Sequence, residues 1–281
     1  MRCSIRLLDF SGAALVMAIV NCNDDSFYAP SRAFCERAVE KALEAEGDGA
    51  SIIDFGAESS RPGASYISEE EELERLVPVI EMFRRRSSLP VSVDTRKAAV
   101  ARAALEAGAD MVNDISALSD DPLMGGLCAE RGSWVVLMHK KGEPVDMQTA
   151  PHYDDLAGEM KAFFSSAVNR ALSSGISSDR IILDPGVGFG KTLDDNLEII
   201  RRLEEICGRD YPVMVGLSRK SFLGEICGTD NVPLDVSERL PGTLAAHAAA
   251  IMNGAGIIRV HDVKEHADLV KVLSALSSKN G

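Results

Sequence analysis

Eight short apolar runs recur along the 281-residue chain, and each ends in polar or glycine-rich residues. The runs cover residues 15–21, 51–56, 90–95, 111–116, 134–139, 180–186, 212–217 and 257–262. Runs this apolar are typical of parallel strands that are buried on both faces of a sheet. Eight of them, separated mostly by helical segments in a chain of this length, predict a (β/α)8 TIM barrel.

The segments between the runs support this fold. Residues 69–85 place apolar side chains on one face of a helix, and Ser68 with Glu71 predicts a capping box at its start. Amphipathic periodicity also covers residues 97–107, 155–172 and 192–206. A doubly wound sheet is the competing fold. It is less favoured because the strand count is eight and no dinucleotide fingerprint follows the first strand.

One domain over residues 1–281 is expected, since the chain shows no linker, low-complexity tract or shift in composition. Residues 3–13 are predicted to form a short hairpin that closes the bottom of the barrel. The segment 263–276 is expected to pack on the outside of the barrel.

Composition limits the partners and the compartment. A formal net charge of −13 argues against nucleic acid or an anionic membrane as the main partner. No run approaches the roughly 18 to 20 apolar residues of a membrane span, and the start MRCSIRLLDFSG does not resemble a signal peptide. Six scattered cysteines without a CxxC motif predict reduced thiols in a cytoplasmic protein.

The stretch DPGVGFGKT, residues 184–192, looks at first like a phosphate-binding loop. Counting back from its Gly-Lys-Thr, the first glycine of such a loop would fall at Pro185, which has no N–H to donate. The alternating glycines do not fit a dinucleotide fingerprint either. Asp184 ends an apolar run, which is a recurring place for an active-site carboxylate.

Polar residues collect at the ends of the predicted strands, where a TIM barrel carries its chemistry. They are Asn21, Asp54, Asp94, Asn113, Asp114, His139, Asp184, the SRKS of residues 218–221, Arg259, His261 and Asp262. For one strand alone, a polar end can simply cap a loop or a helix. Eight such ends that converge on one rim favour a binding site.

Two groups of side chains suggest the ligand. Asp94, Asn113 and Asp184 suit a flat heterocycle edged with N–H and C=O groups, such as a guanine-like or pterin ring. The cations Arg61, Lys220 and Arg259, together with His261, suit an anion with several oxygens.

These residues lie in motifs that resemble those of dihydropteroate synthases nearly from end to end. The motifs are DSF (25–27), ESSRPGA (58–64), SVDTRKA (92–98), AGADMVNDIS (107–116), LMHKKGEP (137–144), ILDPGVGFGKT (182–192), GLSRKSFLG (216–224), LPGTLAAHAAA (240–250) and IIRVHDVKEH (257–266). The resemblance implies a TIM-barrel transferase of folate synthesis. Such an enzyme joins 6-hydroxymethyl-7,8-dihydropterin diphosphate to 4-aminobenzoate, giving 7,8-dihydropteroate and diphosphate.

The resemblance also implies roles for individual residues. The pterin contacts would be Asp94, Asn113, Met138, Asp184, Phe189 and Lys220. The diphosphate contacts would be Asn21, Ser60, Arg61, Arg259 and His261. The 4-aminobenzoate pocket would contain Phe27, Ser60, Arg61, Pro62, Lys220 and Ser221. The residues that promote the reaction would be Asp25, Arg61, Lys220, Arg259 and His261.

Further expectations follow from the same resemblance. Asn21 would help to hold a Mg²⁺ ion on the diphosphate, because Mg²⁺ takes few protein oxygens beside phosphate. Lys191 would begin the next helix, bind no nucleotide and matter little for pterin affinity, unlike Asp184. The protein would be a homodimer whose aminobenzoate pocket is a target of sulfonamides.

Two loops depart from the family pattern. The usual N-V-T-P-D-S-F reads NCNDDSF from Asn21 to Phe27, so Asn23 and Asp24 replace Thr and Pro. The usual Ser-Thr-Arg-Pro reads SSRP in residues 59–62, which keeps the hydroxyl group. Two alternatives stay open: a corrinoid-linked pterin methyltransferase, which needs no diphosphate site, and a non-catalytic pterin-binding paralogue.

Overall fold

The computed structural model describes residues 6, 8–22, 32–58, 66–142, 147, 150–229 and 232–277. Within these ranges, eight parallel strands form one sheet in the order β6-β5-β4-β3-β2-β1-β8-β7. The strands are β1 (Leu15–Asn21), β2 (Ile52–Gly56), β3 (Val91–Asp94), β4 (Met111–Asp114), β5 (Trp134–Met138), β6 (Ile181–Asp184), β7 (Met214–Val215) and β8 (Ile257–Val260). An isolated parallel bridge between Leu183 and Val213 joins the two edges. The predicted TIM barrel is therefore confirmed.

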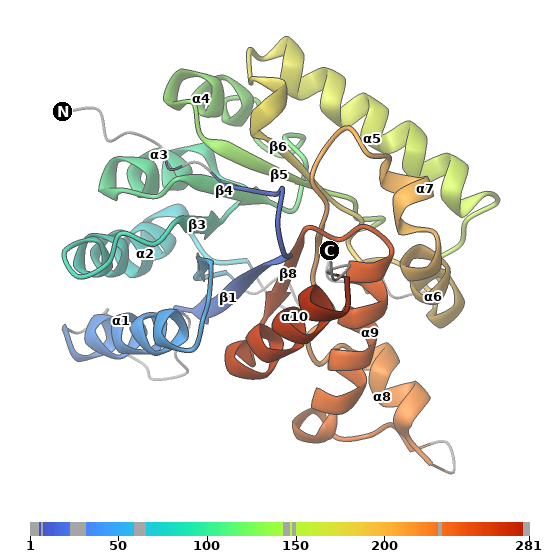
Figure 1. Ribbon diagram of the computed structural model, residues 1–281. Coiled ribbons are helices and arrows are strands. Elements are labelled where there is room, and N and C mark those ends of the chain that lie inside the picture. Colours follow the sequence, from blue (N-terminus) through green and yellow to red (C-terminus); the bar gives the residue numbers. More distant parts are fainter. Residues whose placement is uncertain are drawn as a thin grey trace.

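Helices surround the strands in chain order (Figure 1). They are α1 (Arg32–Gly47), α2 (Glu69–Arg84), α3 (Ala98–Ala107), α4 (Met124–Arg131), α5 (Leu156–Ser173), α6 (Leu193–Arg201), α7 (Leu203–Cys207), α8 (Ser221–Cys227), α9 (Leu240–Met252) and α10 (Val263–Ser277), with short 3-10 helices at Ser178–Arg180 and Val236–Glu238. Among the described helices, none has the length and apolar character needed to span a membrane.

Helix starts show local capping. The Ser68 side chain accepts a hydrogen bond from the Glu71 N–H at 3.1 Å, while the Glu71 carboxylate pairs with Arg75, so only half of the predicted capping box forms. A complete box lies at α6, where Thr192 and Asp195 exchange side-chain and backbone hydrogen bonds. The Thr of the Gly-Lys-Thr sequence is thus a helix cap.

The barrel interior is divided along its axis. Apolar side chains at the amino ends of the strands form a cluster of Met17, Ile52, Met111, Trp134, Val136, Ile182, Met214 and Ile257. Because strand side chains alternate in direction, the inward positions further along each strand fall at its carboxyl end. Those positions include Asp54, Asp94, Asn113, Asp184 and Arg259. The amino end of the barrel is therefore filled with apolar side chains. Polar side chains line the carboxyl end, which is the mouth of the barrel.

The N-terminal segment covers the apolar end. Leu8 and Phe10 pack against the interior cluster, and the Arg6 carbonyl accepts a hydrogen bond from the Trp134 indole at 3.1 Å. Arg6 also pairs with Asp110 at 3.1 Å. Residues 6 and 8–13 contain no strand, and the rest of the predicted hairpin lies outside the described residues. The described residues thus cover the bottom of the barrel, as predicted, but they do not form the strands of a hairpin.

Candidate active site

The carboxyl ends of the strands bring the predicted pterin residues to one edge of the sheet. In the strand register, Asp94 of β3 lies beside Asn113 of β4, and Met138 of β5 lies beside Asp184 of β6. On the other side of Asp94 stands Gly56, where an added Cβ would come within 3.2 Å of the Asp94 Cβ. The glycine therefore leaves room for the carboxylate side chain.

Arg259 of β8 joins two carboxylates across the mouth. Its Nε lies 2.6 Å from Asp54 Oδ2, and its Nη2 lies 2.8 Å from Asp94 Oδ2. Asn113 also donates to Asp54 Oδ2 at 3.3 Å. Burial raises the pKa of Asp94, and the positive charge of Arg259 opposes that rise. The mouth thus holds a hydrogen-bonded network of two carboxylates, an amide and a guanidinium group.

Asp54 belongs to this network but not to the predicted ligand contacts. It is fully buried, and its Oδ1 has no hydrogen-bond partner among the described residues. Its place at the end of a predicted strand was visible in the sequence. Its partnership with Arg259 depends on the closure of the barrel, which brings β2 and β8 onto either side of β1.

The DPGVGFGKT loop follows β6 and folds back against the end of β5. Asp184 Oδ1 accepts a hydrogen bond from the Gly186 N–H at 2.7 Å. A Cβ on Gly186 would lie 2.0 Å from the His139 carbonyl oxygen, and one on Gly190 would lie 2.0 Å from the Lys141 carbonyl oxygen. These glycines serve the close approach of two backbone segments rather than the binding of a nucleotide.

Lys191 lies inside this loop, almost fully buried. Its Nζ donates to the carbonyl oxygens of Gly186 at 2.9 Å and Phe189 at 3.0 Å, and lies 3.0 Å from His139 Nδ1. Burial lowers the pKa of Lys191 to about 7 and that of His139 to about 3. The next helix begins at Leu193 rather than at Lys191, where it was predicted to begin, and the Lys191 side chain lies at the centre of the loop.

Lys220 crosses the mouth from the loop after β7. It donates to the Val187 carbonyl, and its Nζ lies 4.4 Å from the centroid of the Phe189 ring. Burial lowers the pKa of Lys220 to about 8, and burial also raises the pKa of Asp184. The cation, the aromatic ring and the carboxylate therefore lie on one wall, with Met138 buried beside Asp184 on the neighbouring strand.

The diphosphate candidates are only partly described. His261 is exposed just after β8, and its Nδ1 lies 2.9 Å from Ser218 Oγ. Asn21 is exposed at the end of β1, and Ser221 begins α8. The predicted residues Asp25, Phe27, Ser60, Arg61 and Pro62 lie outside the described residues.

Burial makes the thiol of Cys22, next to Asn21, a poor nucleophile. Its side chain is fully buried, and burial raises the pKa of its thiol to about 12. Because the thiolate is the reactive form of cysteine, this group stays inert near neutral pH.

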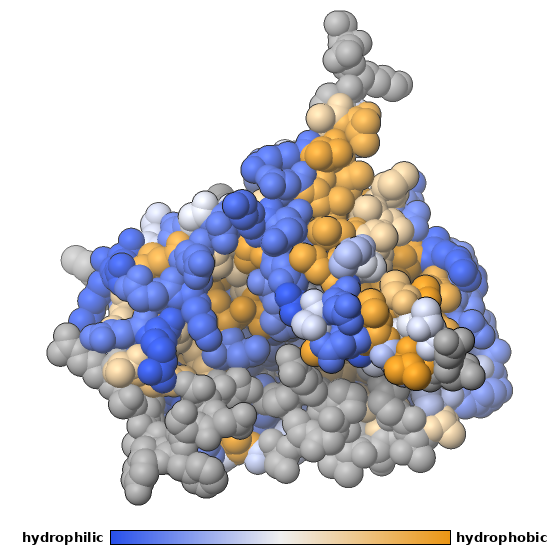
Figure 2. Space-filling view, turned by 90° about the horizontal axis from the view of Figure 1, so that it is seen from below, coloured by the Kyte–Doolittle hydropathy of each residue, from blue (hydrophilic) through white to orange (hydrophobic). Residues whose placement is uncertain are grey.

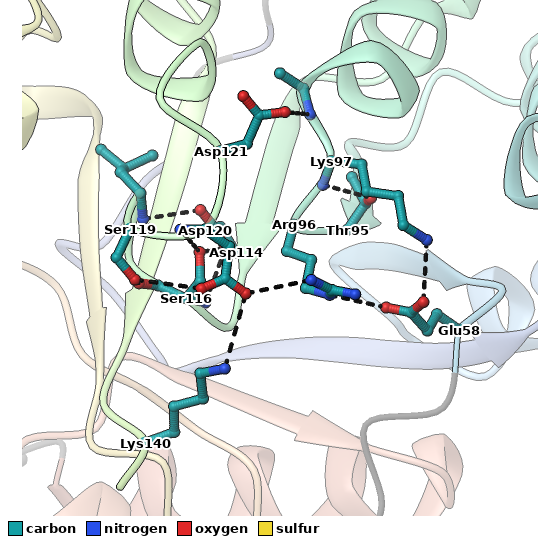
Figure 3. A network of polar contacts seen from close by, with 12 residues as sticks. Glu58, Thr95, Arg96, Lys97, Asp114, Ser116, Ser119, Asp120, Asp121 and Lys140 are labelled. Carbon is teal, nitrogen blue, oxygen red and sulfur yellow. Dashed lines mark hydrogen bonds and ion pairs between the residues drawn. The ribbon is translucent and has the colours of Figure 1, made fainter. Parts of the chain in front are cut away.

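An ion-pair network flanks the mouth and joins the loops after β2, β3, β4 and β5 (Figure 3). Glu58 pairs with Arg96 at 3.1 Å and with Lys97 at 3.0 Å. Asp120 lies 3.4 Å from Arg96 and 3.8 Å from Lys140. Sequence reasoning did not assign these residues, although Arg96 and Lys97 directly follow a predicted strand end. The network fixes the loops around the mouth relative to one another.

Comparisons with known proteins identify the family. A family model described as "Pterin binding enzyme" matches residues 17–261. A dihydropteroate synthase from Synechocystis is 43% identical, covering 96% of this chain and 92% of that protein. A crystal structure of the Yersinia pestis enzyme with a sulfonamide drug complex has a TM-score of 0.87 and 40% identity, covering 96% of this chain and 95% of that one. A Xanthomonas albilineans enzyme in complex with 7,8-dihydropteroate has a TM-score of 0.86 and 37% identity, covering 99% of this chain and 98% of that one.

These matches are to synthases along nearly the whole chain, so they favour the synthase over the corrinoid-linked alternative. The chain belongs to the family of dihydropteroate synthases, transferases that condense 6-hydroxymethyl-7,8-dihydropterin diphosphate with 4-aminobenzoate to give 7,8-dihydropteroate and diphosphate.

Proposed function

We propose that the barrel mouth carries out this condensation, with its acids and amide binding the pterin and its cations binding the diphosphate. The observation that carries the proposal is that Asp94 and Asn113 lie side by side at the mouth, while Asp184 lies near the cation–π pair of Lys220 and Phe189. Carboxylates accept the N–H groups of the amino-pyrimidinone edge, and the amide both donates and accepts. The pterin ring then lies edge-on to the acids and flat against the aromatic wall.

The cations of the site serve the leaving group. Cleavage of the carbon–oxygen bond places negative charge on diphosphate and positive charge on the pterin methylene group. Arg259, His261 and Arg61 stabilise the diphosphate as that charge develops. The aniline nitrogen of 4-aminobenzoate is uncharged near neutral pH, so positioning can replace a strong base.

Mg²⁺ fits this mouth as a cation held chiefly by the substrate. Among the described residues there is no group of three or more His, Cys, Asp or Glu side chains suited to a metal ion. Mg²⁺ often keeps several waters and takes its other ligands from phosphate oxygens, so the exposed carboxamide of Asn21 suffices as a protein ligand. When bound, the ion neutralises charge on the diphosphate.

The aminobenzoate pocket combines Lys220 and Ser221 with Phe27, Ser60, Arg61 and Pro62. Lys220 supplies the positive charge that a carboxylate needs, and Ser221 offers a hydroxyl and a backbone N–H at the start of α8. The other four residues come from the two loops outside the described ranges, and their roles rest on the family resemblance.

A homodimer is supported by the surface of α9, which contains no charged residue. Thr243, His247 and Ala250 are its buried residues, whereas Ala245 and Met252 are exposed, Met252 by 77%. The lower side of Figure 1, seen directly in Figure 2, carries a band of hydrophobic residues bordered by hydrophilic surface. Exposed apolar surface of this kind is typical of an interface, and a second copy of the chain is the proposed partner.

A cytoplasmic location is supported by the cysteines. The described free thiols are Cys22, Cys35, Cys128, Cys207 and Cys227. Free thiols persist in a reducing compartment.

One assay tests the reaction. The protein is incubated with pterin diphosphate, 4-aminobenzoate and Mg²⁺, and dihydropteroate is measured. Product formation that depends on both substrates supports the synthase. Binding of pterin diphosphate without product would identify the non-catalytic paralogue, and methyl transfer to or from a corrinoid protein would identify the methyltransferase.

A further inference from the structure

A buried pair of histidines lies behind the barrel mouth. His247 of α9 and His266 of α10 are both fully buried, and their rings meet edge to face with centroids 4.9 Å apart. His247 Nδ1 lies 3.0 Å from His266 Nε2. Neither residue is among the substrate contacts proposed above, so the reaction leaves the pair unexplained.

Backbone groups at the two ends fix which nitrogens carry protons. The Asp262 carbonyl, 2.5 Å from His266 Nδ1, can only accept, so this nitrogen carries a hydrogen. In a neutral ring, His266 Nε2 is then bare and accepts from His247 Nδ1–H. The last nitrogen, His247 Nε2, is bare in turn and accepts from the Leu217 N–H at 3.2 Å.

The resulting chain of three hydrogen bonds joins the loops after β7 and β8. Leu217 leads into the segment that carries Lys220, and Asp262 directly follows His261. The same loops also meet directly, through the hydrogen bond between His261 and Ser218 and through the Arg219 guanidinium on both carboxylate oxygens of Asp262.

Arg219 adds a constraint on its own loop. Its backbone adopts a φ of +57°, which a residue with a side chain rarely occupies, and its N–H donates to Thr243 Oγ1 at 3.1 Å. Thr243 and His247 lie one helical turn apart on the buried face of α9. This helix therefore holds the loop at Leu217 and again at Arg219.

We propose that His247 and His266 are positioning residues whose neutral, directional pair sets the spacing between the loop of Lys220 and the loop of His261. The proposal rests on the roles proposed above for Lys220 and His261. Through this spacing the pair fixes how the aminobenzoate and diphosphate ends of the site face each other.

The surroundings favour neutral rings. Burial lowers the pKa of both, the neighbouring His266 and the charge of Lys220 lower that of His247 further, and the Val215 carbonyl raises it. The Asp262 carbonyl, with the carboxylates of Asp262 and Glu265, raises the pKa of His266 without overcoming burial. A proton added to either ring would put an N–H on His247 Nε2, either directly or by reversing the central bond. The Leu217 N–H would then lose its acceptor.

Nitrogen-15 NMR of the full-length chain, labelled at its five histidines, tests the bridge without any substitution. We expect two rings in the Nδ1–H form, with a scalar coupling across their N–H···N hydrogen bond. Neither ring should titrate between about pH 8 and about pH 6, the range around the ordinary histidine pKa of about 6.5. An Nε2–H form on either ring, or titration of either within that range, would overturn the proposal.

Kinetics of His247→Phe, His266→Phe and the double variant test the positioning. Each single substitution keeps a ring but removes the bridge, and we expect kcat/KM to fall about tenfold with a raised KM for 4-aminobenzoate. The double variant should lose no more than the singles, because both residues act through one chain. His247→Gln keeps an acceptor near Leu217 and should recover part of the loss.

His152→Phe is the matched control, since the His152 ring is exposed and its ion-pair partner among the described residues is the nearby Asp154. Losses that add in the double variant, or thermal destabilisation with unchanged kcat/KM and KM, would contradict positioning. A wild-type protein that makes no dihydropteroate would contradict the proposed function instead, and the NMR result would still decide whether the bridge exists.

Discussion

The Lys191 ammonium group lies at the centre of the loop that carries Asp184 and Phe189. The family resemblance implied that this side chain matters little for pterin affinity, but its buried contacts within the loop favour the opposite expectation. Lys191→Met would remove the ammonium donor from the carbonyl oxygens of Phe189 and His139, and a buried acceptor left without a donor costs about 1–3 kcal/mol. We expect a lower free energy of unfolding in denaturant titrations and a pterin affinity about tenfold weaker by calorimetry. Lys161→Met, at an exposed ion pair with Glu205, is the control. Equal pterin affinity in both variants would contradict this role.

Lys220 sets a limit on activity at alkaline pH. Its pKa is lowered to about 8, so the free enzyme loses this positive charge as the pH rises through that value. Binding of the 4-aminobenzoate carboxylate needs the charged form, and kcat/KM should therefore fall above about pH 8. Lys220→Arg keeps the charge at all these pH values and should flatten the alkaline limb, even if its overall rate is lower. An unchanged alkaline limb in Lys220→Arg would assign the titration to another group.

At the scale of helices and strands, local patterns predict most of the fold. Each described strand lies within its predicted apolar run, because a buried parallel strand leaves a contiguous signal. The predicted helix 192–206 is divided at Arg202 into α6 and α7, and no local pattern marked that break. The sequence also did not show that the Lys191 side chain is buried in the loop, because this depends on carbonyl groups that come together only when the loop folds.

The glycine loop offers a test of close backbone approach. Gly190 has a φ of +66° and no room for a Cβ, whereas Gly132 has a φ of +64° with nothing within 4 Å of that position. Gly132→Ala therefore measures the strain of a positive φ alone, about 1–2 kcal/mol. Gly190→Ala adds a clash with the Lys141 carbonyl and should destabilise the protein more and weaken pterin binding. Chemical denaturation and calorimetry of both variants give the comparison. Similar losses in the two would show that the loop can move apart without harm.

At the scale of the whole molecule, the barrel topology made it possible to predict which residues lie at the rim of the site. It did not predict which of these side chains pair with one another. Strand ends of a parallel barrel meet at one edge, so the sequence alone was enough to group Asp94, Asn113 and Asp184. The contact between Asp54 and Arg259 spans 205 positions in the chain and depends on barrel closure and side-chain reach. The Glu58 network likewise needs four loops in place. The sequence therefore indicated the ligand class better than the contacts within the mouth.

The assembly provides the last prediction. If a second copy covers the uncharged face of α9, a charge placed there must be buried without a partner, which opposes association. Ala245 is exposed on this face, so Ala245→Glu should fold normally and shift the protein from dimer toward monomer in sedimentation experiments. The matched control is Ala162→Glu, also at an exposed helical alanine but on α5, which lies apart from α9 in Figure 1. It should leave the dimer intact. A dimer of unchanged affinity in Ala245→Glu would place the interface elsewhere. A wild-type protein that sediments as a monomer would remove the homodimer from the proposed function, while leaving the reaction and the barrel mouth untouched.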